Sequence, residues 1–299
     1  MQTRSRSFAV GSALALGVVT TVAAAPASAA DLTCGSVIMT STSLTQDLVC
    51  DGSSDGLVIG ADGITLDLKG FSISGPGAYA TPRAGVRSAR HAQVTITNGH
   101  ISGFQAAVVL DESTQGVVSK ISASGNDQSI NLSGGGGHLV SRNSISGSGR
   151  DAVRVGLSAG NVISQNTLSD NVFGIFIADG SSANLVERNT VSSTAGAGLA
   201  TFSATSGTTF AQNTVTGGGA DGLQVGADTV GTVVKQNTLS FNAADGIDAA
   251  GTTTLTKNTA TYNGALGIRA VVPVTDGGGN KAALNGDPAQ CLGVICSAP

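Results

Sequence analysis

The chain has 299 residues, a formal net charge of −4 and only 11% charged residues. This mildly acidic balance, without a basic stripe, excludes nucleic acid as an expected partner. Glycine is abundant at 43 residues, yet the mean hydropathy is positive. That combination favours many tight turns joined to short buried strands over a disordered chain.

The first thirty residues have the pattern of a secretory signal peptide. Arg4 and Arg6 form a positive start, an apolar stretch follows, and Ala27-Ser28-Ala29 forms an A-x-A cleavage site. We therefore expect a secreted, extracellular protein whose mature chain begins at Ala30 or Asp31. No later stretch reaches the ~18 consecutive apolar residues that a membrane helix needs, so membrane insertion is not expected.

A repeat of about 23 residues runs through most of the mature chain. The phrase Asn-Thr-apolar-Ser/Thr returns in steps of 21 to 24 residues, and a Gly-apolar phrase keeps nearly the same step. Periods of ~20–50 residues indicate stacked supersecondary units instead of one globular core. The phrase and its degenerate copies begin at Asn143, Asn166, Asn189, Asn213, Asn237 and Asn258.

Apolar residues alternate with polar ones around each repeat, as in Ile64, Leu66 and Leu68. Period two over a few residues predicts short, half-buried strands. No segment after the signal peptide has a helical period, and no proline lies between Pro82 and Pro273, so ladder hydrogen bonds can continue. We therefore predict an all-β solenoid, a parallel β-helix of about nine or ten coils stacked ~4.8 Å apart.

The recurring asparagine has a structural interpretation. The residues at this position in successive coils would occupy one turn, where each amide donates to one neighbouring coil and accepts from the other. We also expect each asparagine to adopt the left-handed conformation that such a bend needs. The set comprises Asn166, Asn189, Asn213, Asn237 and Asn258.

Four cysteines lie in two pairs near the ends of the mature chain. In an exported protein, the bridges Cys34–Cys50 and Cys291–Cys296 are the simplest of three connectivities. Zinc would need all four thiolates to meet, and a stack holds its two ends apart, so no metal is predicted. We divide the chain into an N-terminal cap at 31–60, repeats at 61–275 and a C-terminal cap and tail at 276–299, because open strand edges need covering.

The chain resembles the right-handed parallel β-helix proteins of the pectin-lyase-like superfamily, and is especially similar to secreted actinobacterial members. The resemblance spans essentially the whole mature chain and implies a right-handed solenoid. This superfamily mixes polysaccharide lyases, hydrolases, epimerases, adhesins and non-enzymes, so no single activity is implied. The segments that carry the resemblance are Cys34-Gly35, Asp47-Leu48-Val49-Cys50, Ile64-Thr65-Leu66-Asp67-Leu68-Lys69-Gly70, the repeats, and the tail from Gly286-Asp287-Pro288 to Cys296.

Alignment of the coils on the Gly-apolar phrase places outward residues in columns about one strand spacing apart. The first column runs Arg87, Val109, Asn131, Arg154, Phe176, Ala200, Gln224, Asp248 and Arg269. The second, directly before the glycine, runs Phe173, Ala197, Asp221, Asp245 and Leu266, with Asp151 one coil earlier.

Asp221, Asp245 and Asp248 form the sharpest candidate catalytic site, with Gln224 and Arg269 beside them as candidate binding residues. Stacked carboxylates need a cation, an arginine or a raised pKa. Paired carboxylates serve as acid and base in polysaccharide hydrolases, and a Ca²⁺ ion between them would suit a lyase. The alternative is structural: Asp-Gly is a common turn pair, and an exposed Asp248–Arg269 pair contributes ~0–1 kcal/mol.

The remaining candidates are weaker. A second cluster, formed by Arg150, Asp151 and Arg154, is explained by a local ion pair, although Arg154 stays a candidate binding residue. The histidines at positions 91, 100 and 138 have no metal-ligand spacing, and we expect them at turns or on the surface. The chain has no Trp and two Tyr, whereas sugar-processing grooves usually offer such rings for stacking.

Three functions follow from these observations. The main interpretation is a non-catalytic extracellular module that binds a polysaccharide or cell-wall glycan, or serves as a cell-surface scaffold. The second is a polysaccharide lyase or glycoside hydrolase that uses the aspartate cluster, with Ca²⁺ as a cofactor only in the lyase case. The third is a protein-binding adhesin or assembly subunit, in which Phe173 and Phe176 form an exposed apolar patch. The sequence predicts no oligomeric state.

Overall fold

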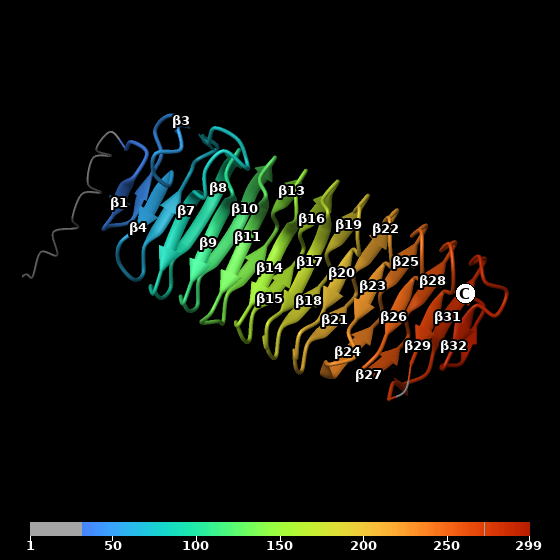
Figure 1. The fold of residues 1–299 in the computed structure, drawn as a ribbon. Helices are drawn as coiled ribbons and strands as arrows, with labels where there is room; N and C mark the ends of the chain where they lie inside the picture. Colours follow the sequence, from blue (N-terminus) through green and yellow to red (C-terminus); the bar gives the residue numbers. More distant parts are fainter. Residues whose placement is uncertain (1–31, 272) are drawn as a thin grey trace, which may run out of the picture.

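A computed structural model describes residues 32–271 and 273–299 of the chain. The predicted signal peptide lies outside these described residues. Within them the chain forms strands and turns and no helix, and hence no helix that could cross a membrane. The strands wind into an elongated stack that runs from β1 at one end to β32 at the other (Figure 1). This confirms the predicted all-β, parallel solenoid.

One sheet runs the whole length of the stack, and we call it the long sheet. Its neighbouring strands are all parallel, and each comes from the next coil of the chain. In order, the strands are β1 (Ser36–Ile38), β4 (Leu57–Ile59), β7 (Ala84–Ala89), β9 (Ala106–Asp111), β11 (Gln128–Ser133), β14 (Asp151–Gly156), β17 (Phe173–Ala178), β20 (Leu199–Thr201), β23 (Leu223–Val225), β26 (Ile247–Ala249), β29 (Ile268–Ala270) and β32 (Cys291–Leu292).

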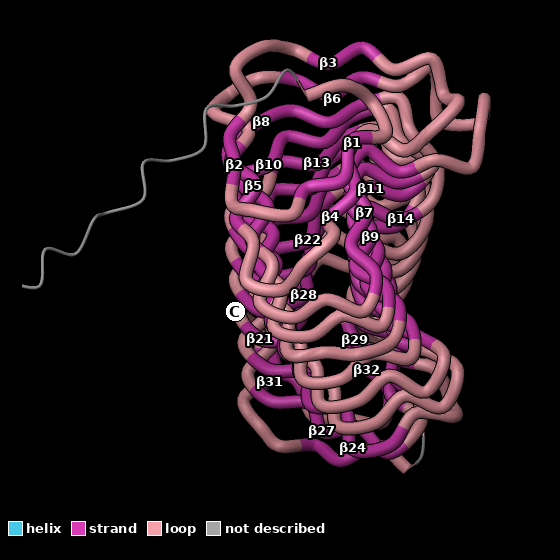
Figure 2. The backbone as a smooth tube through the Cα atoms, turned by 90° about the vertical axis from the view of Figure 1, so that its left-hand side faces the viewer, coloured by secondary structure: helices cyan, strands magenta, loops and turns pink. Residues whose placement is uncertain are grey.

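Two further stacks of parallel strands close each coil, and Figure 2 shows them opposite the long sheet. The first contains β2 (Thr42–Ser43), β5 (Thr65–Asp67), β8 (Thr95–Ser102), β10 (Val117–Ser124), β12 (Leu139–Ser141), β15 (Val162–Ser164), β18 (Leu185–Glu187), β21 (Thr209–Ala211), β24 (Val230–Lys235), β27 (Thr252–Thr256) and β30 (Thr275–Asp276). The second contains β3 (Leu48–Val49), β6 (Ser72–Ser74), β13 (Ser144–Ser146), β16 (Thr167–Ser169), β19 (Thr190–Ser192), β22 (Thr214–Thr216), β25 (Thr238–Ser240), β28 (Thr259–Thr261), β31 (Asn280–Ala283) and β33 (Cys296–Ser297).

The stack has about eleven turns, slightly more than the nine or ten expected. The difference arises at the ends. Strands β1 and β4 fall within the segment predicted as an N-terminal cap, and β32 falls within the predicted tail, yet all three pair in the long sheet. The boundaries drawn at 60 and 275 stay predictions.

The core is one continuous apolar column along the axis of the stack. Each of these coils contributes to the long sheet a first inward residue that is fully buried and paired in register with its neighbours. Burial of such a side chain stabilises by ~1.5–3 kcal/mol, and a single coil could not achieve it alone. This inward row is Leu57, Val86, Val108, Ile130, Val153, Ile175, Leu199, Leu223, Ile247 and Ile268.

The predicted asparagine ladder is present and buried. Asn166 Nδ2 donates to Asn189 Oδ1 at 2.9 Å, and Asn189 Nδ2 donates to Asn213 Oδ1 at 3.0 Å. The same pattern continues from Asn143 to Asn280. One expectation was wrong: the left-handed residue is the one before each asparagine, such as Gln212 with φ 57°. The asparagine therefore does not form the bend, and its side chain hydrogen-bonds buried backbone groups instead.

Both predicted disulfides are confirmed. Cys34 and Cys50 are bonded with Cα atoms 5.7 Å apart, and Cys291 and Cys296 with Cα atoms 6.3 Å apart. These separations lie within the usual range for a disulfide. Each bridge holds a short terminal segment that has neighbouring coils on one side only.

His138 contradicts the expectation that the histidines lie at turns or on the surface. Its side chain is buried, and its Nδ1 accepts a hydrogen bond from Gly116 N at 3.0 Å. His138 N donates to Asn161 Oδ1, and Asn161 N donates to Asn184 Oδ1 in the same way. His138 therefore occupies the position that Asn161 and Asn184 occupy in the next two coils. Burial lowers the pKa of the imidazole from 6.5 to about 4.

This burial predicts a pH-dependent loss of stability that His138→Asn removes. Below pH 6.5 the unfolded histidine binds a proton that the folded one binds only near pH 4, so falling pH destabilises the wild type by up to about 3 kcal/mol. Asparagine keeps the acceptor for Gly116 N without titrating. Urea unfolding at about pH 7 and about pH 4.5 should show a smaller loss in the variant. An equal loss in both proteins would refute this role for His138.

Candidate functional site

Asp221, Asp245 and Asp248 meet on the outer face of the long sheet, as predicted. They come from two adjacent coils, at β23 and β26, and Arg269 of β29 lies one coil further. Asp221 Oδ1 accepts the backbone N–H of Asp245 at 2.9 Å, and Asp245 Oδ1 accepts that of Leu266 at 2.8 Å. The second column is therefore joined by carboxylate-to-backbone hydrogen bonds.

Arg269 binds two of the three carboxylates. Its Nε donates to Asp245 Oδ2 at 3.0 Å, and its NH2 group donates to Asp248 Oδ2 at 2.5 Å. The two aspartates are buried, whereas the arginine side chain is 44% exposed. A guanidinium that spans both oxygens neutralises the repulsion that stacking creates. The arrangement is thus a closed ion-pair network.

The same arrangement occurs near the other end of the long sheet. Asp55 Oδ1 accepts the N–H of Ala84 at 2.7 Å, and its Oδ2 accepts from Arg87 Nε at 2.6 Å. In both places an aspartate before the glycine position binds the backbone and the arginine of the next coil. This repetition favours a structural role for Asp245.

Asp221 and Asp248 nevertheless have raised pKa values. Burial raises the pKa of the Asp221 carboxyl above its ordinary 3.8, and the carboxylates of Asp248 and Asp245 raise it further. Burial likewise raises the pKa of Asp248, although Arg269 opposes this. Gln224 stands beside Asp248 in the first column and is half-buried. These residues present hydrogen-bonding groups without a free pair of carboxylates.

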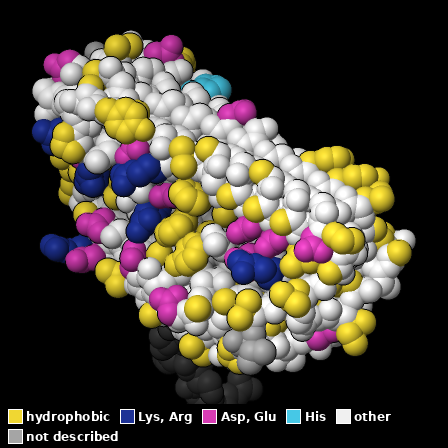
Figure 3. All heavy atoms as spheres, turned by 45° about the vertical axis from the view of Figure 1, so that its right-hand side comes forward, with side chains coloured by type: hydrophobic (Ala, Val, Ile, Leu, Met, Phe, Trp, Pro, Cys, Tyr) yellow, Lys and Arg dark blue, Asp and Glu magenta, His cyan; other side chains and the backbone are white. Residues whose placement is uncertain are grey.

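Arg154 and Phe176 lie apart from the aspartate cluster, because Ala200 stands between Phe176 and Gln224 in the column. The Arg154 guanidinium lies 5.3 Å from the centre of the Phe176 ring, and its NH2 group donates to Asp179 at 2.8 Å. The predicted first column is therefore confirmed in register, but its candidate binding residues form two separate groups. Figure 3 shows Lys and Arg side chains next to Asp and Glu side chains at more than one place on this side of the molecule.

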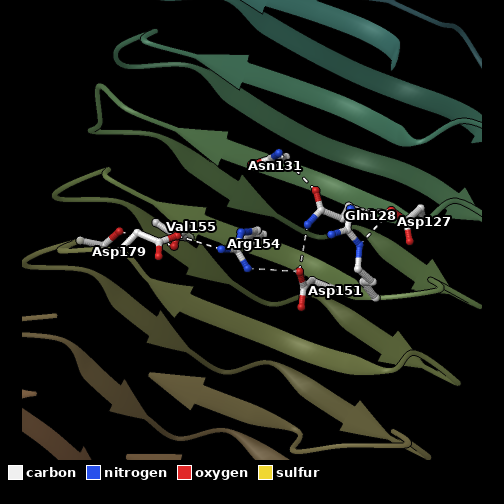
Figure 4. A network of polar contacts seen from close by, with 9 residues as sticks. Asp127, Gln128, Asn131, Asp151, Arg154, Val155 and Asp179 are labelled. Atoms are coloured by element: carbon white, nitrogen blue, oxygen red, sulfur yellow. Dashed lines mark hydrogen bonds and ion pairs between the residues drawn. The ribbon is translucent and has the colours of Figure 1, made fainter. Parts of the chain in front are cut away.

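Arg154 belongs to a polar network that the sequence did not reveal (Figure 4). Asn131 Nδ2 donates to Gln128 Oε1 at 3.2 Å, and Gln128 Nε2 donates to Asp151 Oδ2 at 3.0 Å. Asp151 is 4% exposed, and burial raises the pKa of its carboxyl. The network crosses neighbouring coils of the long sheet.

A polar hollow opens beside this network. It has a volume of about 260 Å³ and borders an apolar floor of Ala106 and Val109. Among the described residues, the buried Nε of Arg83 has no hydrogen-bond partner. The polar side chains that line the hollow are Arg83, Arg87, Gln105, Asp111, Gln128, Asn131 and Ser133.

The loop 75–83 forms one wall of this region. It joins β6 to β7, where the following coils have only residues 103–105 and 125–127. Its Tyr79 reaches across the coils to Gly149, where a Cβ would collide with the tyrosine hydroxyl. A second hollow of about 240 Å³ lies between the loop, Gln105 and Asp127. The long loop and its tyrosine were the only sequence signals for this site.

The calcium ion of the lyase hypothesis finds no preformed ligand set in the described part of the chain. No group of three or more His, Cys, Asp or Glu side chains is arranged there to hold a metal ion. Asp245 and Asp248 are bound by Arg269 instead.

A family model described as a right-handed β-helix region matches residues 55–215, which is more than half of the chain. The chain therefore belongs to the right-handed β-helix family, and the predicted handedness is confirmed. Among curated protein sequences, none matches the chain. The predicted similarity to actinobacterial members stays a prediction.

Several solved structures share this fold. A mutant of the periplasmic alginate epimerase AlgG has a TM-score of 0.60 and 15% identity over 72% of this chain and 58% of its own. The catalytic domain of a mutant GH87 α-1,3-glucanase in complex with nigerose has a TM-score of 0.57 and 15% identity over 83% of this chain and 62% of its own. The Dettilon tailspike protein has a TM-score of 0.59 and 15% identity over 83% of this chain and 54% of its own. This chain thus spans less than two thirds of each, and such identities show the fold alone.

The network around Arg269 predicts a large effect of Arg269→Ala on stability. Removal of the guanidinium leaves Asp245 and Asp248 buried without a cation, so we expect a loss of about 1–3 kcal/mol, less than a fully buried pair would give. Arg90→Ala is the matched control, because Arg90 and its partner Glu112 are 79% and 58% exposed. Chemical unfolding measures both variants. Equal, small losses would show that the network contributes little.

Proposed function

We propose that this chain is an exported β-helix protein that binds a polysaccharide on the outer face of the long sheet without cleaving it. The observation that carries the proposal is the hollow beside the loop 75–83. Its lining offers guanidinium, amide, hydroxyl and carboxylate groups over a small apolar floor. Sites for small polar ligands combine an apolar surface with a few converging polar groups in this way.

Arg83 is the strongest single anchor for a sugar. Arg83 lines the hollow, and its buried Nε has no hydrogen-bond partner among the described residues. A ligand oxygen that meets the guanidinium would accept a charge-assisted hydrogen bond. Arg87 in the same hollow is already bound to Asp55. Tyr79, which lines the adjoining hollow, supplies a ring of the kind on which sugars stack.

A non-catalytic role agrees with the aspartate cluster. A general acid and base must be free to exchange protons with the substrate. Asp245 and Asp248 are instead bound by Arg269, and Asp245 also binds the backbone of Leu266. The structural interpretation of these residues is therefore preferred to the catalytic one, and no Ca²⁺ is part of the proposal.

A hydrolytic or lyase function remains the second candidate, now centred on Asp151 instead of the predicted cluster. Asp151 is buried, its pKa is raised by that burial, and Asp127 lies in the preceding coil. A carboxyl pKa raised by burial is a property that general acids use. The alginate epimerase and the α-1,3-glucanase of the comparison show that enzymes use this fold.

The adhesin hypothesis loses support from the packing of its aromatic residues. Phe173 and Phe176 are half-buried, and their ring centres lie 5.4 Å apart. Phe176 also stacks on Phe202 at 5.7 Å. The rings therefore pack against one another, and this leaves less of the exposed patch that was predicted for a protein partner.

The test is a polysaccharide screen with Arg83→Ala and Arg142→Ala as a matched pair. Both remove an arginine, but Arg142 is on another strand stack and contacts Gln165. Affinity electrophoresis in soluble alginate, xylan and dextran should show binding by the wild type and by Arg142→Ala. Arg83→Ala should bind about tenfold more weakly or worse, since hydrogen bonds to charged groups contribute ~1.5–3 kcal/mol.

A parallel assay for new reducing ends separates binding from cleavage. The proposal expects none. Shortened chains made by the wild type, and abolished by Asp151→Asn, would establish the enzyme instead. Equal binding by the two arginine variants would remove the hollow as the site, and an absence of binding to all three polysaccharides would contradict the function.

A further inference from the structure

A row of left-handed residues runs along the corner between the strands β13 to β31 and the long sheet. We call it the corner row. Each member follows its strand directly, and the members from Gly147 to Tyr262 donate a backbone N–H hydrogen bond to the next coil. All have φ between 53° and 68°. The row comprises Gly147, Asp170, Ser193, Gly217, Phe241, Tyr262 and Leu284.

Two aromatic residues stand where this conformation favours glycine. Phe241 and Tyr262 both have φ 58°, which is unfavourable for a bulky side chain. Glycine occupies the same row at Gly147 and Gly217 without that cost. The hydrogen bonds to the neighbouring coil hold this conformation, as they also do at Asp170 and Ser193.

The two rings form an exposed platform. Their centres lie 5.0 Å apart and their planes differ by 6°, so they stack in parallel. Phe241 is 61% exposed and Tyr262 is 50% exposed. Figure 3 shows hydrophobic side chains gathered near the C-terminal end of the molecule. Tyr262 covers one face of the Phe241 ring, and Gly217, the corner residue on the other side, has no side chain to cover the opposite face.

A trough leads up to this open face. It has a volume of about 450 Å³ and occupies the three coils before Phe241. Gly217, Gly218 and Gly219 form its end nearest the rings, and the exposed side chains of Asp170 and Ser193 lie along it. The trough therefore combines a flat apolar face with hydroxyl and carboxylate groups.

We propose that the trough and Phe241 form a second carbohydrate-binding site, in which a pyranose unit of a polysaccharide stacks on Phe241 and hydrogen-bonds to Asp170 or Ser193. A pyranose has an apolar C–H face and a polar rim, which match the ring and the trough. The site lies beyond the hollow at the loop 75–83 and does not require that hollow to bind.

A second copy of the chain fits this surface less well. Fully buried aromatic residues contribute ~150–250 Å² each, so two rings on each partner give at most about 1,000 Å² in total. Part of each side chain is already covered, and specific protein interfaces need more than about 1,000 Å². The platform is of the size that a single sugar ring covers.

The two tyrosines provide a separate optical signal for each site. The chain has no Trp, and its only tyrosines are Tyr79 and Tyr262. Tyr79→Phe therefore leaves Tyr262 as the sole tyrosine fluorophore, and Tyr262→Phe leaves Tyr79. Titration of Tyr79→Phe with soluble dextran, xylan and alginate should change the Tyr262 emission saturably with at least one of them.

Phe241→Gly in the Tyr79→Phe background supplies the decisive variant. Glycine favours the local backbone, so thermal stability should be retained or raised, while the dissociation constant rises about tenfold or more as the stacking contact is lost. A silent Tyr262 with a responsive Tyr79 in Tyr262→Phe would overturn this inference and leave the proposed function standing. A change of mass in light scattering on Phe241→Gly would also overturn it, because the rings would then join two copies. Silence of both tyrosines would contradict both proposals.

Discussion

The hydrogen bonds that hold each coil in register above the next determine the surface of this protein. Backbone pairs run along the stack, and the asparagine ladder adds a buried side-chain link at the same turn of successive coils. Because side chains alternate between inside and outside, a slip of one residue would move the inward row to the surface. The fixed register therefore aligns the outward residues of successive coils into straight columns.

The columns explain the charge pairs on this face. An aspartate in one coil meets the arginine of the next, as in Asp55 with Arg87 and Asp245 with Arg269. Such pairs relieve repulsion between stacked acids and leave few free carboxylates. The two binding sites that we propose lie instead where the repeat is interrupted by the loop 75–83 and where Phe241 and Tyr262 replace glycine in the corner row.

The repeat made the fold and the first outward column predictable, down to the pairing of Gln224 with Asp248 and of Asp248 with Arg269. The alternation of inward and outward residues can be recognised from a few neighbouring residues, and it recurs in each coil. The left-handed residue of each turn was misassigned, because glutamine and arginine have no special preference for that conformation and give no signal. His138 was misplaced because a histidine can replace a ladder asparagine by accepting the same backbone N–H.

The hollow at Arg83 could not be predicted for a different reason. Its residues come from several coils and from a loop that departs from the repeat, and the path of that loop across the sheet depends on packing against Gly149. Alignment by period says nothing about such a segment. Tyr79 and the extra length of the loop can be seen in the sequence, but they identify none of the residues that line the hollow.

Unfolding of Asn213→Ala beside Gln212→Ala tests the role of register most directly. Asn213 Oδ1 accepts from Asn189 N, and its Nδ2 donates to Val186 O and to Asn237, all in buried surroundings. Loss of these bonds should lower the free energy of unfolding by about 3 kcal/mol or more, since each buried group left unsatisfied costs ~1–3 kcal/mol. Gln212→Ala changes an exposed side chain and should lower the free energy of unfolding by under about 1 kcal/mol. Equal, small losses would contradict the claim that the ladder holds the coils in place.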